Sequence, residues 1–471
     1  MQLDEEAHRL RVLLANPPGV KAEPDQTAYY VKAGSRWPFS LHEKSRYCPY
    51  PFSLGYSSAL LKRDIDAEVR VLDGVAEKMT FEDMLDFVQK MDPDMVLMEI
   101  SAPTAKDDMH LLQVVKERAG ATVAVSGALP TALPKETMAM APWVDVCLIG
   151  EYELTTKDLV EHLSQGKALD DVSGLAYRRN DEVVINERRP LLKDLDYLPF
   201  PDREDLPATR YHDFCVHEPN VLMTTSRGCS FGCIFCVERW VTFNSPLYRA
   251  RSAKSIVDEI DYCIKRFGAK QVYFDDQTFT LLKKHVLSVC DEIASRGLNM
   301  KWTCMGDAIS VDYETLKAMA EAGCIGMKFG LESSSQEILQ NIGKPLKLEK
   351  VKQVARWLDD LGMISHATYV FGLPGETRAT VESTLDFALD LNTDSVQIAM
   401  ATPFPGTPFY EWVRANNYLA TNDWEMLDGA QHSVVSLPNL TSADIEELYH
   451  HACGEWSRKR AQKRLSTLLT H

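Results

Sequence analysis

The chain has 471 residues, which at about 150 residues per domain indicates two or three structural units. Its composition, 45% hydrophobic and 25% charged, is typical of a folded soluble protein and excludes a disordered chain. The 51 Lys and Arg residues against 68 Asp and Glu residues give a formal net charge of −17. This acidity argues against a nucleic-acid partner, because binding a phosphate backbone requires a surface rich in Lys and Arg.

The N-terminal stretch carries no signal for export or for a membrane span. Its apolar run, around Val12–Ala15, is short and follows acidic residues instead of a basic region. We therefore expect a cytoplasmic protein without a membrane span. The eleven cysteines are then reduced thiols and not a disulfide framework. Eight of them are scattered along the chain, and for these we expect the role of small buried hydrophobic residues.

Residues 1–165 alternate short apolar runs with amphipathic stretches. The runs that predict strands are Leu10–Ala15, Glu68–Leu72, Met95–Ile100, Thr122–Val125 and Val144–Ile149. The stretches with helical periodicity are Ser53–Lys62, Thr80–Met91, Lys106–Glu117, Pro134–Met140 and Glu153–Leu163. Strands separated by helices of about 10–15 residues form crossover units and a parallel sheet. This rhythm predicts a Rossmann- or flavodoxin-like α/β domain.

One connection of this domain is abnormally long. About 35 residues, a long connection for such a domain, separate the first strand from its helix. A long loop at the carboxyl end of a first strand lies where such sheets bind ligands. Its Tyr29, Tyr30, Arg36 and Trp37 either line a substrate site or pack in the core.

Residues 166–215 are expected to form a linker. Leu175–Arg178 and Val183–Ile185 flank a polar turn, which is typical of a β-hairpin. The proline-rich stretch Leu198–Pro201 then interrupts regular structure, as expected at a domain boundary.

The alternation restarts at Val221. The predicted strands are Val221–Thr225, Gln271–Phe274, Lys301–Cys304, Gly326–Phe329, His366–Phe371 and Ser395–Ala399. The predicted helices are Ala253–Phe267, Lys284–Arg296, Asp312–Ala322, Gln336–Asn341, Lys347–Leu361 and Ala379–Leu391. Six successive β/α units predict a partial (β/α)6 barrel over residues 216–405, since eight would complete it. Residues 406–471 are expected to form a helical C-terminal segment whose basic end is a solvated helix face.

Three cysteines are clustered directly after the first barrel strand, at Cys229, Cys233 and Cys236. This is the carboxyl face of the barrel, where barrel enzymes place their sites. A structural zinc usually takes four ligands from two elements, and no second pair of cysteines or histidines completes such a set here. Three thiolates suit a [4Fe-4S] cluster in which one iron has no protein ligand. The alternative is three packing cysteines clustered by chance.

This CxxxCxxC spacing, with the aromatic Phe235 before the last cysteine, resembles the signature of radical SAM enzymes. The resemblance implies that Cys229, Cys233 and Cys236 are the metal ligands and the catalytic centre. It also implies that S-adenosylmethionine (SAM) chelates the open iron, and that an electron from the cluster releases a 5′-deoxyadenosyl radical that abstracts hydrogen from a substrate. Phe235 is then expected beside the cofactors.

Further segments at successive strand ends, together covering about residues 220 to 410, also resemble this family. Asp276 and Gln277 stand where its Gly-Gly-Glu-type motif meets the methionyl amine, although the motif itself is absent. Glu332 and Ser333 resemble the turn that binds the ribose and the carboxylate, and Gly372 resembles the adenine-side region. Each has an ordinary alternative, because carboxylates cap helices and glycines form turns.

The N-terminal domain resembles the cobalamin-binding domain that precedes many radical SAM barrels. The resemblance implies cobalamin contacts at strand ends, from Pro17, Ser101, Ser126, Gly127, Gly150 and Glu151. The alternative is that these residues form tight β/α turns. The Asp-x-His-x-x-Gly motif that ligates cobalt is missing. Asp108 and His110 match the first part of this motif, but position 113 is Gln where the motif has Gly. His110 is therefore expected on a helix surface.

Taken together, the chain resembles class B radical SAM methyltransferases. The resemblance implies a [4Fe-4S] cluster, SAM and cobalamin as cofactors, and a flavodoxin- or ferredoxin-type electron donor as partner. The expected reaction is methylation of an unactivated carbon of a small or lipid-like metabolite through methylcobalamin. One alternative is a ring-forming or other non-methylating reaction by an enzyme of the same architecture, for which the N-terminal domain need not bind cobalamin. Another is a non-catalytic sensor, which would need a signalling module that the sequence does not show.

Overall fold

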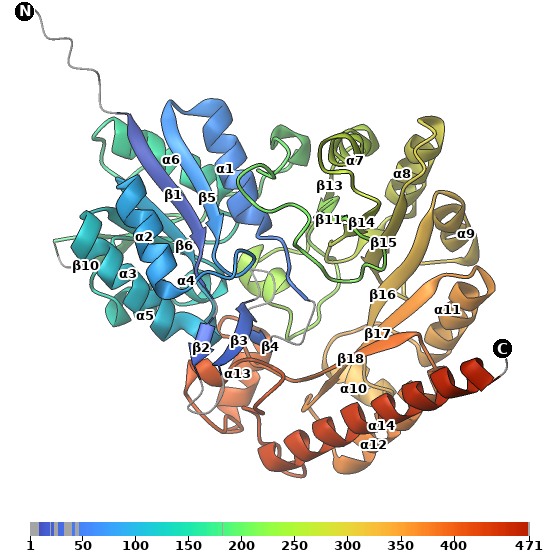
Figure 1. The fold of residues 1–471 in the computed structure, drawn as a ribbon. Coiled ribbons are helices and arrows are strands. Elements are labelled where there is room, and N and C mark those ends of the chain that lie inside the picture. The colour runs from blue at the N-terminus through green and yellow to red at the C-terminus, as the bar shows by residue number, and fades with distance from the viewer. Residues whose placement is uncertain are drawn as a thin grey trace, which may run out of the picture. The chain divides into compact units, whose positions relative to one another are not determined.

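The computed structural model describes residues 9–18, 20–22, 27–32, 40–42, 47–180 and 182–469 (Figure 1). The chain divides into two compact units. The first unit comprises Met1–Asp213 together with Trp240–Asn244, and the second comprises Phe214–Arg239 together with Ser245–His471. Of the residues in the long N-terminal connection, Arg36 and Trp37 lie outside the described part.

The first unit is built on a seven-stranded sheet with the order β10-β9-β8-β7-β6-β1-β5. Its parallel strands are β1 (Leu10–Asn16), β5 (Ala67–Asp73), β6 (Met95–Glu99), β7 (Thr122–Ser126) and β8 (Val146–Leu148). In chain order these five strands are arranged 2-1-3-4-5, which is the flavodoxin-like order. The predicted α/β domain is thereby confirmed, and the strand order reverses between β1 and β6.

Helices cover both faces of this sheet. The helices are α1 (Phe52–Asp64), α2 (Phe81–Met91), α3 (Ala105–Ala119), α4 (Ala128–Ala132), α5 (Pro134–Met140) and α6 (Glu153–Ser164). On one face, alternate strand residues such as Leu13 and Val96 pack with Met84 of α2 and Leu112 of α3 in one hydrophobic core. Because neighbouring strand residues point to opposite faces, the other alternate set, including Leu14, faces α1 and α6.

The predicted hairpin extends this sheet instead of lying apart as a linker. Strand β9 (Leu175–Arg179) pairs antiparallel with β8, and β10 (Glu182–Ile185) pairs antiparallel with β9. The long connection after β1 carries a small sheet that sequence periodicity did not indicate. It consists of β2 (Val20–Ala22), β3 (Thr27–Lys32) and β4 (Ser40–His42) in antiparallel pairs. Cross-strand partners decide both features, and no local pattern encodes those partners.

The second unit contains six parallel strands in sequential order, as the partial barrel predicts. They are β11 (Asn220–Met223), β14 (Gln271–Phe274), β15 (Lys301–Gly306), β16 (Cys324–Glu332), β17 (Ile364–Phe371) and β18 (Ser395–Met400). The helices that alternate with them are α7 (Ala253–Phe267), α8 (Lys283–Ser295), α9 (Tyr313–Glu321), α10 (Gln336–Asn341), α11 (Leu348–Asp360) and α12 (Arg378–Leu391). Such a sheet presents all six carboxyl ends at one edge.

Strand register separates an apolar outer face from a polar inner face in this half-barrel. Phe274 and Cys304 are paired across β14 and β15, and both are fully buried against the helices. On the opposite face Lys328 of β16 pairs with His366 of β17, which pairs with Ser395 of β18. The inner face of the half-barrel is therefore more hydrophilic than its helix-covered face.

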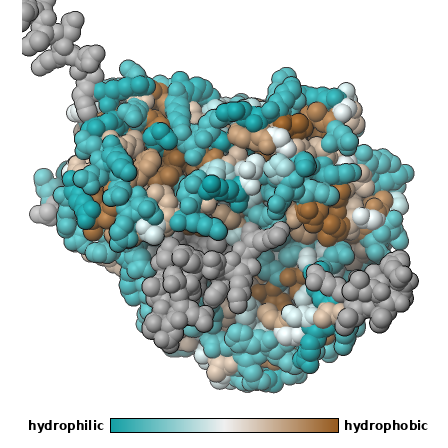
Figure 2. Space-filling view, in the orientation of Figure 1, coloured by the Kyte–Doolittle hydropathy of each residue, from teal (hydrophilic) through white to brown (hydrophobic). Residues whose placement is uncertain are grey.

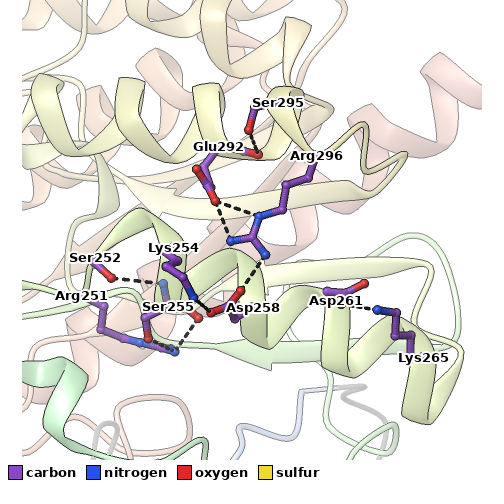
Figure 3. Close-up of polar contacts among 10 residues, drawn as sticks. All are labelled: Arg251, Ser252, Lys254, Ser255, Asp258, Asp261, Lys265, Glu292, Ser295 and Arg296. Atoms are coloured by element: carbon purple, nitrogen blue, oxygen red, sulfur yellow. Dashed lines mark hydrogen bonds and ion pairs between the residues drawn. The ribbon is translucent and has the colours of Figure 1, made fainter.

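Ion pairs join the outer helices α7 and α8 (Figure 3). Arg296 donates to Asp258 of α7 at 2.6 Å and to Glu292 at 2.6 Å, and Lys254 also contacts Asp258, at 2.7 Å. These pairs are partly solvated, so each stabilises the fold by less than about 1 kcal/mol. Glu259 of α7 is fully buried, and its bond to Arg251 at 2.6 Å lets the chain bury that carboxylate.

The C-terminal segment is helical at both ends. Helix α13 (Pro408–Ala415) and the long α14 (Ser442–Leu469) confirm the expected helices. Residues 416–441 between them are not helical apart from a short 3-10 turn at Trp424–Met426, and they contain isolated β-bridges. On the face shown in Figure 2, hydrophilic side chains cover most of the described surface and hydrophobic ones form separate patches. None of the helices in the described part of the chain is both long enough and apolar enough to cross a membrane.

Gly127, directly after β7, is dictated by close backbone packing. Its φ of 118° belongs to a region that only glycine adopts readily, and a Cβ atom there would lie 2.5 Å from the carbonyl oxygen of Ile100. For any other residue at position 127, the strained backbone alone would lower the free energy of unfolding by about 1–3 kcal/mol, and the clash with Ile100 would lower it further.

We predict that Gly127→Ala lowers the midpoint of thermal unfolding of the apo-protein well below that of Gly120→Ala. Gly120 is the matched control, because it also has a positive φ (64°) but nothing lies within 4 Å of its Cβ position. Equal midpoints for the two variants would contradict the close approach of Gly127 to the backbone of Ile100.

Candidate active site

The three clustered cysteines lie in one loop at the carboxyl end of β11. Two short strands, β12 (Ser226–Arg227) and β13 (Arg249–Ala250), pair antiparallel and fix where the loop begins. Gly228 follows with a φ of 89°, and a Cβ atom there would stand 2.1 Å from the carbonyl oxygen of Leu247, so only glycine fits. The amide of Cys236 donates to the carbonyl of Cys233 at 3.1 Å, which closes the second half of the loop into a turn.

All three cysteines are half-buried thiols outside any disulfide. Burial raises the pKa of Cys233 to about 11 and that of Cys236 to about 12, and it also raises the pKa of Cys229. Nearby thiols add to this, because Cys229 and Cys233 both raise the pKa of Cys236. Without a metal the loop therefore holds neutral thiols, and metal binding has to displace their protons.

The donor set fits a cluster better than a single ion. Among the described residues no group of three or more His, Cys, Asp or Glu side chains is arranged around one metal ion. Ligands of one ion must converge on one point. In an iron–sulfur cluster each thiolate binds a different iron, so the sulfurs stand further apart. The loop supplies three cysteine thiols, one for each of three irons.

A buried ion pair, Lys344 with Glu332, lies beside this loop. The turn that carries Lys344 docks on the loop, since the amide of Ile234 donates to the carbonyl of Ile342 at 3.0 Å. Nζ of Lys344 donates to Oε1 of Glu332 at 2.6 Å, with each side chain about 10% exposed or less. Burial lowers the pKa of Lys344, but electrostatic interactions, above all with the Glu332 carboxylate, raise it above its ordinary value. Lys344 therefore supplies a positive charge close to the cysteines.

Sequence reasoning missed Lys344, because a lysine in a turn is usually a solvated residue. The only local signal in the sequence is the glycine before it, Gly343. In the structure a Cβ atom at Gly343 would lie 2.8 Å from the carbonyl oxygen of Gly232 in the cysteine loop. Glu332, which was expected in the site, has a φ of 69° and sits at a register shift between β16 and β17. Its neighbour Ser333 is fully buried, with Oγ 3.4 Å from Oγ1 of Thr384.

Asp276 and Gln277, at the end of β14, contact the start of the cysteine loop. Both oxygens of the Asp276 carboxylate accept hydrogen bonds from Thr225 and Ser226. Oε1 of Gln277 accepts from the amide of Gly228 at 2.9 Å. These two residues, expected at the methionyl amine, are thus bound to protein donors in the part of the chain described.

Gly372, expected near the adenine, lies in a turn closed by a buried glutamate. Its φ is 96°, and its Cβ position faces the side chain of Ile445 in α14 at 3.1 Å. Oε2 of Glu376 accepts from the amides of Gly372 at 2.6 Å and Leu373 at 2.9 Å. Oε1 of Glu376 is buried without a partner among the described residues. Burial raises the pKa of Glu376 to about 7 despite these two bonds.

In the first unit, the residues expected at cobalamin gather at the carboxyl edge of the sheet. Pro17 follows β1 and Ser101 follows β6, on the two sides of the point where the strand order reverses. Ser101 is buried and its Oγ lies 3.1 Å from Oγ1 of Thr104. Ser126 ends β7 and is fully buried. The buried Oδ1 of Asn16, at the end of β1, has no partner among the described residues, so this edge retains acceptor capacity for a polar ligand.

Gly150 and Glu151 follow β8 and also make contacts within the protein. The amide of Gly150 donates to Oγ1 of Thr131 at 3.0 Å, and its Cβ position lies 2.9 Å from Nη2 of Arg188. Oε2 of Glu151 accepts from the amide of Leu192 at 3.2 Å. His110 is exposed in α3 and stacks on Phe81 with ring centroids 5.7 Å apart, as expected of a helix-surface residue.

The raised pKa of Glu376 predicts a pH-dependent stability. Its pKa is 4.5 in an unfolded chain and about 7 when folded, so the folded state favours the proton. The stability that this proton provides is present below about pH 4.5 and is lost as the pH rises through about 7.

Glu376→Gln removes this titration. Between those two pH values, the free energy of unfolding of the wild-type apo-protein should fall by up to about 3 kcal/mol more than that of the variant. Urea unfolding at both pH values measures the difference, and parallel curves for the two proteins would contradict the raised pKa.

Two family models match this chain, one for each α/β unit. Residues 223–388 match the radical SAM superfamily, and residues 41–160 match the B12 binding domain. An uncharacterized methyltransferase of Pyrococcus horikoshii is 33% identical over 403 residues, which cover 85% of this chain and 86% of the relative. The anaerobic magnesium-protoporphyrin IX monomethyl ester cyclase of Rubrivivax gelatinosus is 28% identical over 369 residues, covering 77% of this chain and 66% of the relative.

A solved structure shares the fold. The radical S-adenosylmethionine methyltransferase TsrM of Kitasatospora setae, with cobalamin and a [4Fe-4S] cluster bound, superposes with a TM-score of 0.68. The identity is 18%, and the match covers 94% of this chain and 85% of that one. The chain therefore belongs to the radical SAM superfamily, as a cobalamin-dependent radical SAM enzyme whose cofactors are a [4Fe-4S] cluster, SAM and cobalamin.

Proposed function

We propose that the protein is a C-methyltransferase that adds a methyl group to an unactivated carbon of a small or lipid-like metabolite. The observation that carries the proposal is the loop with three cysteines at the carboxyl edge of the half-barrel, in a chain that also matches a B12 binding domain. The similarity over most of its length to the methyltransferase of Pyrococcus horikoshii favours methylation as the outcome.

In this proposal the cofactors are held by the carboxyl edges of the two sheets. Cys229, Cys233 and Cys236 hold the cluster. The residues proposed at SAM are Phe235, Gln277, Glu332, Ser333 and Gly372. Those proposed at cobalamin are Pro17, Ser101, Ser126, Gly127, Gly150 and Glu151. When bound, the cluster supplies the electron that cleaves SAM, and cobalamin carries the methyl group to the substrate carbon.

The chain's own residues provide binding, charge and shielding. Lys344 offsets negative charge next to the cysteines, and its bond to Glu332 orients a carboxylate toward hydroxyl groups of a ligand. Apolar residues behind the inner face, such as Phe274 and Trp302 with ring centroids 5.1 Å apart, keep water out of the sheet beneath the site. An external electron donor of the flavodoxin or ferredoxin type completes the reaction.

A second candidate is a ring-forming reaction without methyl transfer. It is favoured by the similarity to the cyclase of Rubrivivax gelatinosus, which covers 77% of this chain. The two candidates share every cofactor-binding feature described above, and they differ in whether the product contains a carbon atom from SAM.

The cluster assignment predicts the metal content. After anaerobic reconstitution with iron, sulfide and hydroxocobalamin, we expect about four irons and one cobalt per chain. The variants Cys229→Ala, Cys233→Ala and Cys236→Ala should each lose most of the iron and keep the cobalt. The control Cys453→Ala removes another half-exposed cysteine, in α14, and should keep both metals. Iron that survives in all three loop variants would overturn the assignment.

The reaction assignment predicts transfer of a labelled methyl group. We would incubate the reconstituted enzyme anaerobically with a reductant, methyl-deuterated SAM and a metabolite extract, and follow deuterium by mass spectrometry. A methyltransferase places the label in a product that gains one CD3 group in exchange for one hydrogen. Turnover that consumes SAM to 5′-deoxyadenosine and leaves every product unlabelled would support the ring-forming alternative instead.

A further inference from the structure

Three consecutive residues after β14 lie alongside the first residues of the cysteine loop. Asp276 contacts Thr225 and Ser226, Gln277 contacts Gly228, and Oγ1 of Thr278 lies 3.9 Å from Sγ of Cys229. The contacts follow one another in the same direction along both segments. The chain from Asp276 to Thr278 thus runs in register with the chain that leads to the first cysteine.

Donors of Thr225 and Ser226 fill the hydrogen-bond acceptor sites of the Asp276 carboxylate. Its Oδ1 accepts from the amides of Thr225 at 2.6 Å and Ser226 at 3.2 Å, and its Oδ2 accepts from the hydroxyls of Thr225 at 2.5 Å and Ser226 at 2.7 Å. The side chain is fully buried. An ionised carboxylate has about four lone-pair sites, and here four donors of this chain use them. No further site remains for the ammonium group of a ligand.

A second layer closes the network. Nε2 of His285, in α8, lies 3.2 Å from Oγ1 of Thr225. Because that hydroxyl donates to Asp276, it accepts from His285, which assigns the ring proton to Nε2. Burial lowers the pKa of His285, which agrees with a neutral ring. The ring also packs edge-on against Tyr248, with centroids 6.4 Å apart. His285 of α8 therefore also stabilises the start of the cysteine loop, through its contact with Thr225.

We infer that Asp276 is a positioning residue that holds the cluster loop, with Gln277 as its second anchor, and that it does not contact SAM. This inference rests on the proposed role of the three cysteines. It replaces the expected SAM contact of Asp276 by an action through Thr225, Ser226 and Gly228. The physical reason is that one buried carboxylate orients two successive backbone amides, and so sets where the backbone delivers Cys229.

The direct test is hydrogen exchange in the apo-protein, which requires no cofactor. Asp276→Ala should raise the exchange rate of the amides of Thr225 and Ser226 about tenfold or more, and Gln277→Ala should do so at Gly228. The control Asp312→Ala removes a helix-capping carboxylate of α9 in the same unit and should leave these amides unchanged. Unchanged exchange in Asp276→Ala would overturn the inference.

The consequence for the cluster is tested separately. After reconstitution without SAM, Asp276→Ala should bind less iron than Asp312→Ala, and the electron paramagnetic resonance spectrum of its reduced cluster should change. The conservative Asp276→Asn keeps one oxygen for the two amides and should restore most of the iron. If Asp276→Ala binds iron with an unchanged spectrum but loses the spectral response to added SAM, Asp276 contacts SAM and the inference is wrong.

A variant that leaves Asp276 in place covers the case in which Asp276→Ala fails to fold. Thr225→Val with Ser226→Ala removes the two hydroxyl donors and keeps the side-chain volumes nearly constant. It should reproduce the altered cluster spectrum, and a wild-type spectrum would contradict the inference. Because the exchange experiment uses the apo-protein, a failure of this inference is distinguishable from a failure of the proposed function, which would appear as absent iron or absent methyl transfer in the wild type.

Discussion

Parallel strand pairing is the constraint on which the other features depend. In each unit the β/α connections carry the chain back across the sheet, so that every parallel strand ends at the same edge. Segments remote in sequence are thereby brought together without long-range sequence signals. Gly228, Gln277, Glu332 and Lys344 belong to separate segments, yet they share the edge at which the cysteine loop lies. Each unit supplies such an edge by itself.

Two buried carboxylates at the edge of the second sheet illustrate two ways to hold charge. Glu332 pairs with the cation of Lys344, and the pair lies beside Cys233. Asp276 has four hydrogen-bond donors in its immediate surroundings. A charge is costly to bury unless it is paired or fully hydrogen-bonded, and both solutions satisfy that demand. The first uses one cation, whereas the second uses four hydrogen-bond donors from two successive residues.

Glycines at the strand ends also serve the fold. Gly127 allows the backbone after β7 to approach Ile100, and Gly228 allows the cysteine loop to pass Leu247. The sequence analysis gave Gly127 as an implied cobalamin contact. The distances from its Cβ position show that backbone packing alone requires a glycine there. Small residues at a binding edge therefore have a structural reason that has to be considered before a functional one.

The sequence by itself determined the two α/β units, the boundaries of most strands and helices, and the loop that holds the three cysteines. Periodicity and thiol spacing are local properties, and they are read without knowing any partner. Only the tertiary structure decided that the hairpin β9–β10 joins the first sheet and that Lys344 lies next to Cys233. It also decided that the Asp276 carboxylate accepts hydrogen bonds from Thr225 and Ser226. These facts depend on pairing between segments far apart in the chain, because hydrogen-bond partners and buried charges are chosen by packing in three dimensions.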